Sequence, residues 1–227
     1  TLIVSFYLNG YINKIFVGNK LTDPVNERSS HKYPATRSGG LSVFFTICLA
    51  CAFGVSTGKL VIPLYALLSV FFLTLTGFAN DLITVRYREK FFLQIFAAVL
   101  MFQSGYSIDS FHGVFNIYEV PWWLELTSSL FVFVVVVNAL NLIDGLDGMA
   151  SFISMKFFLI AGGIILVSKT EWFLFFPIII SALVGFLWFN FNRNKKVFLG
   201  DTGSLFLGSL MAFFVFYFLD SESSLVT

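Results

Sequence analysis

The stretch WWLELTSSLFVFVVVVNALNLIDGLDG, from Trp122 to Gly148, decides the fold class. Its apolar part, Trp122–Asn141, has about the 20 residues that a helix needs to cross ~30 Å of hydrocarbon. Lipid offers the backbone no hydrogen-bond partners, so a segment that crosses a bilayer in this way must be helical. The run then ends in Asn, Asp and Gly residues, which predicts that the helix leaves the membrane there.

The same pattern recurs along the whole chain, which is 57% hydrophobic and only 12% charged. That is about half the charge content of a soluble domain. Further apolar runs occupy Gly40–Thr57, Val61–Ala79, Phe91–Ser107, Met149–Ser168, Trp172–Phe189 and Gly203–Leu219, and Thr1–Asn13 is the end of another helix. We therefore expect an all-α integral membrane protein, a polytopic bundle of about seven complete transmembrane helices plus a partial first helix. Residues 1–227 should form a single transmembrane domain, and the chain is expected to be a fragment truncated at both ends.

The loops between these runs alternate between the two membrane faces, and the basic residues lie mostly on one of them. Segments 14–39, 80–90, 142–148 and 190–202 share one face and carry nearly all of the lysines and arginines outside the helices, whereas the opposite face carries Lys59 and Lys169. By the positive-inside rule the first face is cytoplasmic. We expect a multi-pass protein of the plasma membrane. Its net charge of +1 gives no reason to expect a nucleic-acid partner.

Four polar segments also fall on this face: Glu27–Gly40, Gly77–Gln94, Asn138–Gly148 and Phe198–Ser204. Polar and ionisable residues at the ends of membrane helices are costly unless they are paired or functional. Each segment alone could be loop or capping chemistry, but four on one face predict one carboxylate-rich pocket bordered by cations. Such a pocket at the cytoplasmic interface suits Mg²⁺ and a diphosphate.

The individual residues suggest how the pocket would work. Adjacent Gly39 and Gly40 allow a close backbone approach at a helix start, which suits an anion. Asp81, ahead of three cations that end at Lys90, could hold a cation or accept a proton. Asp144 and Asp147 are three residues apart and can converge on one site. Asp201 precedes a helix in a setting that resembles a phosphate or metal site, and Phe198 offers a flat face to a nucleobase.

At these residues the sequence resembles a known family, the polyprenyl-phosphate N-acetylhexosamine-1-phosphate transferases of glycosyltransferase family 4. The strings NALNLIDGLDG (Asn138–Gly148) and FLGDTGSLFLG (Phe198–Gly208) carry the resemblance most specifically. It implies a UDP-sugar donor such as UDP-N-acetylglucosamine, undecaprenyl phosphate or another polyprenyl phosphate as acceptor, and UMP as the second product. The reaction would initiate a cell-envelope glycan, such as a cell-wall polymer or the O-antigen of lipopolysaccharide.

The resemblance also implies roles for single residues. Asp147 and Asp201 look like the carboxylates of a Mg²⁺ site, which could also take Mn²⁺, and a homodimer is compatible with the family. Asn141, Asp144 and Phe198 look like uridine-binding positions, Lys90 like a phosphate contact, and Asp81 like a catalytic or acceptor-orienting carboxylate. The chain departs from the family at Asn80, where two adjacent aspartates are usual.

A membrane transporter or ion-translocating protein with a cytoplasmic carboxylate site is the alternative, because intramembrane carboxylates also mark ion pathways. A transporter predicts polar residues in the middle of spans, whereas here they cluster at one face.

The loop assignment predicts which positions an impermeant thiol reagent can reach in intact cells. Cysteines placed at Ser30, Arg86 and Lys195 should be shielded, whereas cysteines at Ser107 and Lys169 should be labelled from outside. Labelling of any of the first three in sealed cells would overturn the assignment.

Overall fold

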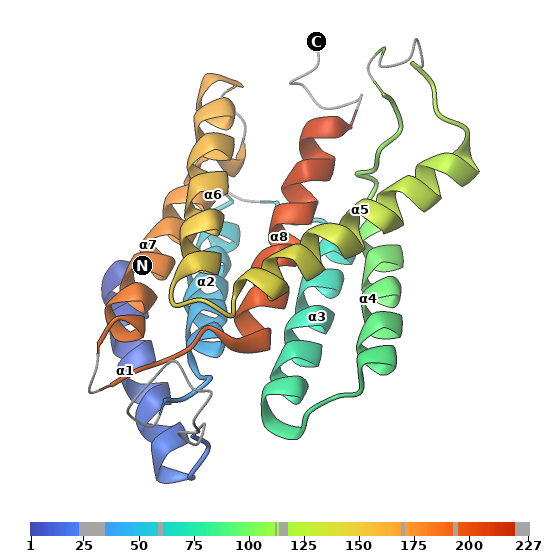
Figure 1. The fold of residues 1–227 in the computed structure, drawn as a ribbon. Coiled ribbons are helices and arrows are strands. Elements are labelled where there is room, and N and C mark those ends of the chain that lie inside the picture. Colours follow the sequence, from blue (N-terminus) through green and yellow to red (C-terminus); the bar gives the residue numbers. More distant parts are fainter. Residues whose placement is uncertain are drawn as a thin grey trace.

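The computed structural model describes residues 1–22, 35–58, 61–111, 113, 118–168, 171–192 and 195–220. Within these ranges the chain is all-α, as predicted, apart from an isolated bridge between Thr36 and Val197. The helices are α1 (Leu2–Gly18), α2 (Gly39–Ser56), α3 (Leu64–Ile83), α4 (Tyr87–Phe102), α5 (Trp122–Ile143), α6 (Met149–Ser168), the 3-10 helix η2 (Glu171–Leu174), α7 (Phe175–Asn190) and α8 (Gly200–Leu219), all drawn in Figure 1.

Every apolar run of the sequence corresponds to a helix, so the membrane bundle is confirmed. By length and composition, the described residues contain six segments able to cross a membrane: α2, α3, α5, Met149–Leu166 of α6, Trp172–Asn190 and α8. The apolar run Phe91–Ser107 differs from the expectation, because its helix α4 is only 16 residues long and begins at Tyr87 rather than Phe91. Its first turn takes in Arg88, Glu89 and Lys90, which loop assignment had placed outside the helix.

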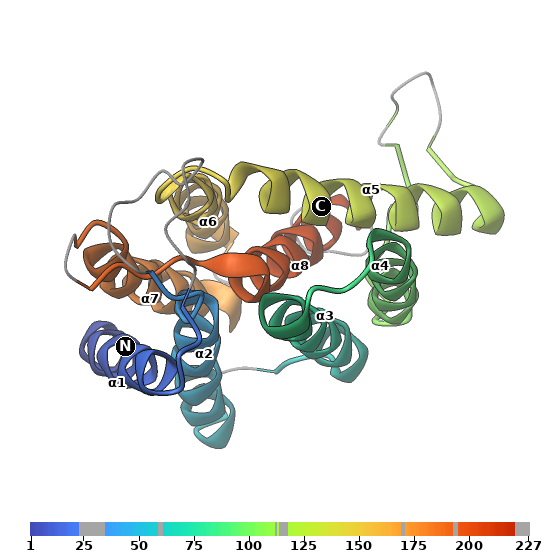
Figure 2. The same ribbon diagram turned by 60° about the horizontal axis from the view of Figure 1, so that its bottom comes forward.

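Helix α8 is the centre of the bundle. Of its span, 78% is buried, against 50% or less in each of the other five. It packs against α2, α3, α5 and α6, and Figure 2 shows these helices around it. Because several helices hold α8 at once, a side chain near its N-terminus has neighbours from different parts of the sequence.

Two glycines let helices reach α8 at backbone distance. A Cβ atom on Gly40 would collide with the backbone nitrogen of Gly203, and one on Gly77 would collide with the carbonyl oxygen of Asp201. The N-terminal end of α2 and the C-terminal end of α3 therefore meet the start of α8 with no side chain between them. This close approach brings the polar segments of the sequence together.

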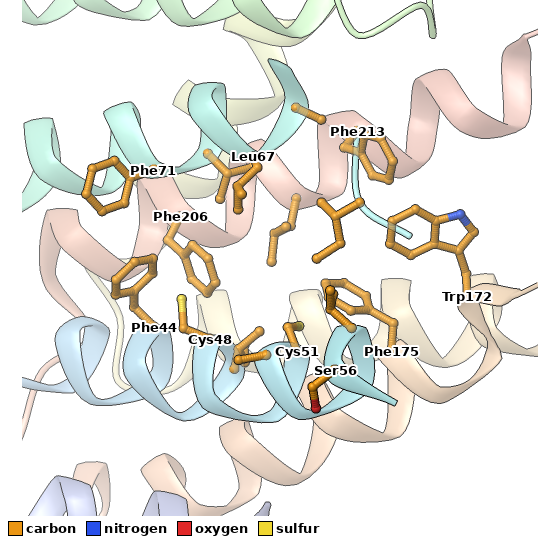
Figure 3. A pocket seen from close by; sticks show the side chains of 17 residues that line it. Phe44, Cys48, Cys51, Ser56, Leu67, Phe71, Trp172, Phe175, Phe206 and Phe213 are labelled. Carbon is orange, nitrogen blue, oxygen red and sulfur yellow. The ribbon is translucent and has the colours of Figure 1, made fainter. Parts of the chain in front are cut away.

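An apolar crevice of about 490 Å³ separates α2 from α3 farther along the helices. Figure 3 shows its wall, which includes Phe44, Phe71, Phe206 and the free cysteines Cys48 and Cys51. None of the residues that line it is charged. The crevice is thus separate from the place where the carboxylates gather.

The backbone contact at Gly77 predicts a stability difference between two glycines in membrane helices. Alanine normally favours a helix over glycine by about 1 kcal/mol, and Gly163 has no atom within 4 Å of an added Cβ. Gly163→Ala should therefore keep or raise the unfolding temperature of the purified protein. Gly77→Ala should lower it, because the clash with α8 costs about 1–3 kcal/mol. Equal unfolding temperatures for the two variants would contradict the close packing.

Candidate active site

The N-terminus of α8 is capped by a carboxylate from another helix. Asp81 on α3 accepts hydrogen bonds from the backbone N–H of Asp201 (3.0 Å) and Thr202 (2.9 Å), and from the Thr202 hydroxyl (2.6 Å). Asp144, which follows α5, lies near the backbone N–H of Gly200. These N–H groups have no partners within their own helix, and the helix dipole favours negative charge beside them. The group that occupies this helix start is therefore a side chain of the protein itself, the Asp81 carboxylate.

Asp201, in the first turn of α8, is the hub of a second group of contacts. Its Oδ2 atom accepts from Lys90 Nζ of α4 (2.6 Å) and from the Asn80 amide of α3. Its Oδ1 atom accepts from the Asn141 amide of α5 (2.9 Å), and Lys90 Nζ also donates to Asn141 Oδ1 (3.0 Å). The sequence-predicted residues Lys90, Asn141 and Asp201 thus meet at one point where four helices converge. We call these three residues and Asn80 the Asp201 cluster.

Solvent can reach the Asp201 cluster. The side chains of Lys90 and Asp201 are 16% and 23% exposed, whereas that of Asp81 is 2% exposed. Arg37 lies beside Asp81, with its Nη1 atom 4.0 Å from Asp81 Oδ1, and its side chain is 45% exposed. A substrate phosphate could therefore approach Lys90 and Arg37, but Asp81 lies behind the surface.

A layer of uncharged contacts supports the cluster, and sequence analysis assigned it no role. Gln94 on α4 and Asn138 on α5 exchange two side-chain hydrogen bonds, of 2.7 and 3.2 Å. Asn141 also donates to the Ser204 hydroxyl (2.8 Å). Gln94 follows Lys90 by four residues and Asn138 precedes Asn141 by three, so each lies on the same helix face as its charged or polar neighbour. That spacing is the feature of the sequence that could have identified Gln94 and Asn138 as part of the site.

Asp147 and Phe198 form a separate contact with one lysine. Lys196 Nζ lies 2.5 Å from Asp147 Oδ2 and 5.5 Å from the centre of the Phe198 ring. The turn between α5 and α6 that carries Asp147 is non-helical, as its glycines predict, and Gly148 has a φ of +70°. Asp147 is thus paired with Lys196 and Asp201 with Lys90, and the metal site expected to join the two carboxylates stays a prediction.

Gly39 and Gly40 have a different setting from the one expected. Both are buried, and their N–H groups donate to the carbonyl oxygens of Phe198 (3.0 Å) and Leu199 (2.8 Å). These N–H groups are committed to the segment that leads into α8, which favours a packing role over the anion-binding role. Residues 27–34 of the same polar segment lie outside the described residues.

The donor atoms of this region suit a divalent cation. Burial, and then the negative charges of Asp201 and Asp81, raise the pKa of the Asp144 carboxyl to about 8. A hard cation nearby would relieve this repulsion, and carboxylate oxygens are its preferred ligands. The described residues contain no group of three or more Asp, Glu, His or Cys side chains placed to hold a metal alone. Mg²⁺ commonly takes only one or two carboxylates and completes its shell with substrate phosphates and water. The carboxylates of this region therefore fit a Mg²⁺ ion that is bound in this way.

The described helices thus form a membrane bundle with a lysine–carboxylate cluster at the ends of four of them. Comparison with known proteins specifies the class further. The sequence profile of the family described as "Glycosyl transferase family 4" matches residues 63–219, more than half of the chain. The chain therefore belongs to glycosyl transferase family 4. This membership does not favour the transporter alternative.

Curated relatives share sequence over most of the chain. It is 28% identical to a "probable undecaprenyl-phosphate N-acetylglucosaminyl 1-phosphate transferase" of Bacillus subtilis, over 92% of this chain and 58% of the relative. It is 33% identical to a "phospho-N-acetylmuramoyl-pentapeptide-transferase" of Staphylococcus saprophyticus, over 76% and 57%. A Prochlorococcus marinus protein of the same name is 31% identical, over 64% and 45%. The chain spans about half the length of these relatives.

Proposed function

We propose that this chain is the membrane domain of an enzyme that moves an N-acetylhexosamine-1-phosphate from a UDP-sugar to a polyprenyl phosphate. The observation that carries the proposal is the Asp201 cluster, which joins the ends of α3, α4, α5 and α8 inside the segment that the family profile matches. The printed names of the relatives, which describe sugar-phosphate transfer, support it. We place the site at the cytoplasmic face of the plasma membrane on the positive-inside rule.

The proposed reaction is a single phosphoryl transfer. An oxygen of the acceptor phosphate forms a bond to the β-phosphorus of the donor, while the bond from that phosphorus to the UMP oxygen breaks. A phosphate monoester already carries a charge of about −1.5 to −2 at pH 7. Activating it demands little, so the protein's task is to bring two anions together and hold them in line.

Different side chains bind the phosphates, the metal ion and the uridine. Lys90, whose ammonium already bridges Asp201 and Asn141, binds phosphate oxygens. Asp147 and Asp201 would hold Mg²⁺, or Mn²⁺ in its place. When bound, the cation neutralises charge on the diphosphate and on the leaving UMP. Asn141, Asp144 and Phe198 bind the uridine, with the Phe198 ring stacked on the base.

Asp81 acts as a positioning residue in this scheme. Both of its oxygens accept hydrogen bonds from the start of α8, and its side chain is 2% exposed. It holds Asp201 in place through the backbone rather than by contact with substrate. This refines the catalytic or acceptor-orienting role expected from the sequence.

Transfer of label from a panel of UDP-sugars to undecaprenyl phosphate, in membranes that contain the full-length protein, tests the proposal. One UDP-sugar should give a lipid product and UMP in a reaction that requires Mg²⁺. Asp201→Asn should lower the rate at least ~100-fold, the scale of a lost positioning or charge-stabilising group. The matched control Glu119→Gln, which also exchanges an acid for an amide but at an exposed site after α4, should retain the rate.

Asn80→Asp addresses the departure from the family. The new carboxylate would face Asp201 in place of the amide that now donates to it, but Lys90 remains to offset the charge. We expect a change in rate of less than ~tenfold. Transfer from no UDP-sugar, or a normal rate for Asp201→Asn, would refute the proposed function.

A further inference from the structure

A second groove with mixed character lies between α1 and α7, away from the Asp201 cluster. The helices touch through small groups, since Ser5 Oγ donates to the carbonyl oxygen of Ala182 (2.7 Å). Toward the cation-rich face, α1 and α7 leave a groove of about 640 Å³. Its lining includes the aromatic residues Phe6, Tyr7 and Trp188 and the lysines Lys14, Lys195 and Lys196. Figure 2 shows α1 and α7 on one side of α8 and α4 on the other.

One end of this α1–α7 groove is apolar and aromatic. The Phe6 ring lies 4.9 Å from that of Trp188, yet Tyr7 and Trp188 are 72% and 49% exposed. A neighbouring groove of about 1090 Å³ shares Phe6, Tyr7 and Trp188 and extends the apolar surface along α7. Exposed aromatic rings of this kind form a surface for hydrocarbon chains.

The other end of the groove is cationic. Lys14, Lys195 and Lys196 all line it, and none of its lining residues is acidic. Lys196 is paired with Asp147. Within the described part of the chain, no ion pair involves Lys14 or Lys195, and both residues are exposed. The ammonium groups of Lys14 and Lys195 are therefore available at the cationic end of the α1–α7 groove.

We propose that the α1–α7 groove binds one anionic phospholipid, with its phosphodiester between Lys14 and Lys195 and an acyl chain against Tyr7 and Trp188. Basic pockets between membrane helices on the cytoplasmic side bind the head groups of anionic lipids, and this groove adds a tail surface to such a pocket. Charge complementarity selects an anion, and the aromatic end selects an amphiphile over a free phosphate. The groove is built from α1, α7 and the segment after α7 that carries Lys195 and Lys196. It adjoins the proposed transferase site through Lys196, which is paired with Asp147.

Native mass spectrometry of the full-length protein in a neutral detergent tests this directly. Dioleoyl-phosphatidylglycerol and dioleoyl-phosphatidylcholine are titrated separately, and inorganic phosphate and undecaprenyl phosphate are then added as competitors. One phosphatidylglycerol should bind more tightly than phosphatidylcholine, and inorganic phosphate should not displace it. Each lysine near the membrane surface contributes about fivefold in affinity for an anionic lipid, so the Lys14→Gln, Lys195→Gln double variant should lose roughly 25-fold.

The controls separate the groove from general surface charge. Lys20→Gln removes a lysine just beyond the end of α1, outside the groove lining, and should leave the affinity unchanged. Lys196 is kept because it contacts Asp147. The inference fails if the double variant binds phosphatidylglycerol normally, or if Lys20→Gln weakens binding as much as Lys14→Gln does. It also fails if phosphatidylcholine binds equally well, or if inorganic phosphate or undecaprenyl phosphate displaces the phospholipid at equal concentration. None of these outcomes depends on transfer activity.

Discussion

The contact between the Asp81 carboxylate and the first N–H groups of α8 is the constraint on which the site depends. A buried carboxylate is costly, but here three hydrogen bonds and the positive end of a helix offset that cost. The contact is possible because Gly77, one turn before Asp81, lets α3 touch the backbone of α8. With the start of α8 fixed in this way, Asp201 is directed to Lys90 and Asn141 rather than to solvent.

The membrane part of this arrangement could be predicted from the sequence, because long apolar runs have one physical solution in lipid. The gathering of polar residues at one face was also predictable from loop parity, and the family resemblance pointed to Lys90, Asn141 and Asp201 among them. The start of α4 could not be predicted. Charged residues such as Arg88 and Lys90 are typical of a loop, yet here they lie in the first turn of α4. An apolar pattern locates a span but does not say how far its helix continues past the membrane.

The partners of individual carboxylates could not be predicted, because they depend on how helices distant in sequence pack together. The sequence suggested a phosphate or metal site at the start of α8, and in the structure the Asp81 carboxylate accepts from the N–H groups there. Gly39 and Gly40 suggested an anion site as well, but their N–H groups hold the segment before α8. Asp147 is paired with Lys196, a contact that nothing in the DGLDG motif indicates. The sequence therefore located the motif residues, but it did not reveal the contact that each of them makes.

Hydrogen–deuterium exchange of the peptide that spans Leu199–Leu205 tests the central claim most directly. In Asp81→Asn the amide side chain can accept only through its oxygen, and its NH₂ group would face backbone donors. The account predicts that this peptide exchanges markedly faster in Asp81→Asn than in the wild type. In Asp147→Asn, which removes the same charge from a carboxylate paired with Lys196, its exchange should not change. Unchanged exchange in Asp81→Asn would show that Asp81 does not hold the start of α8, and would contradict the account.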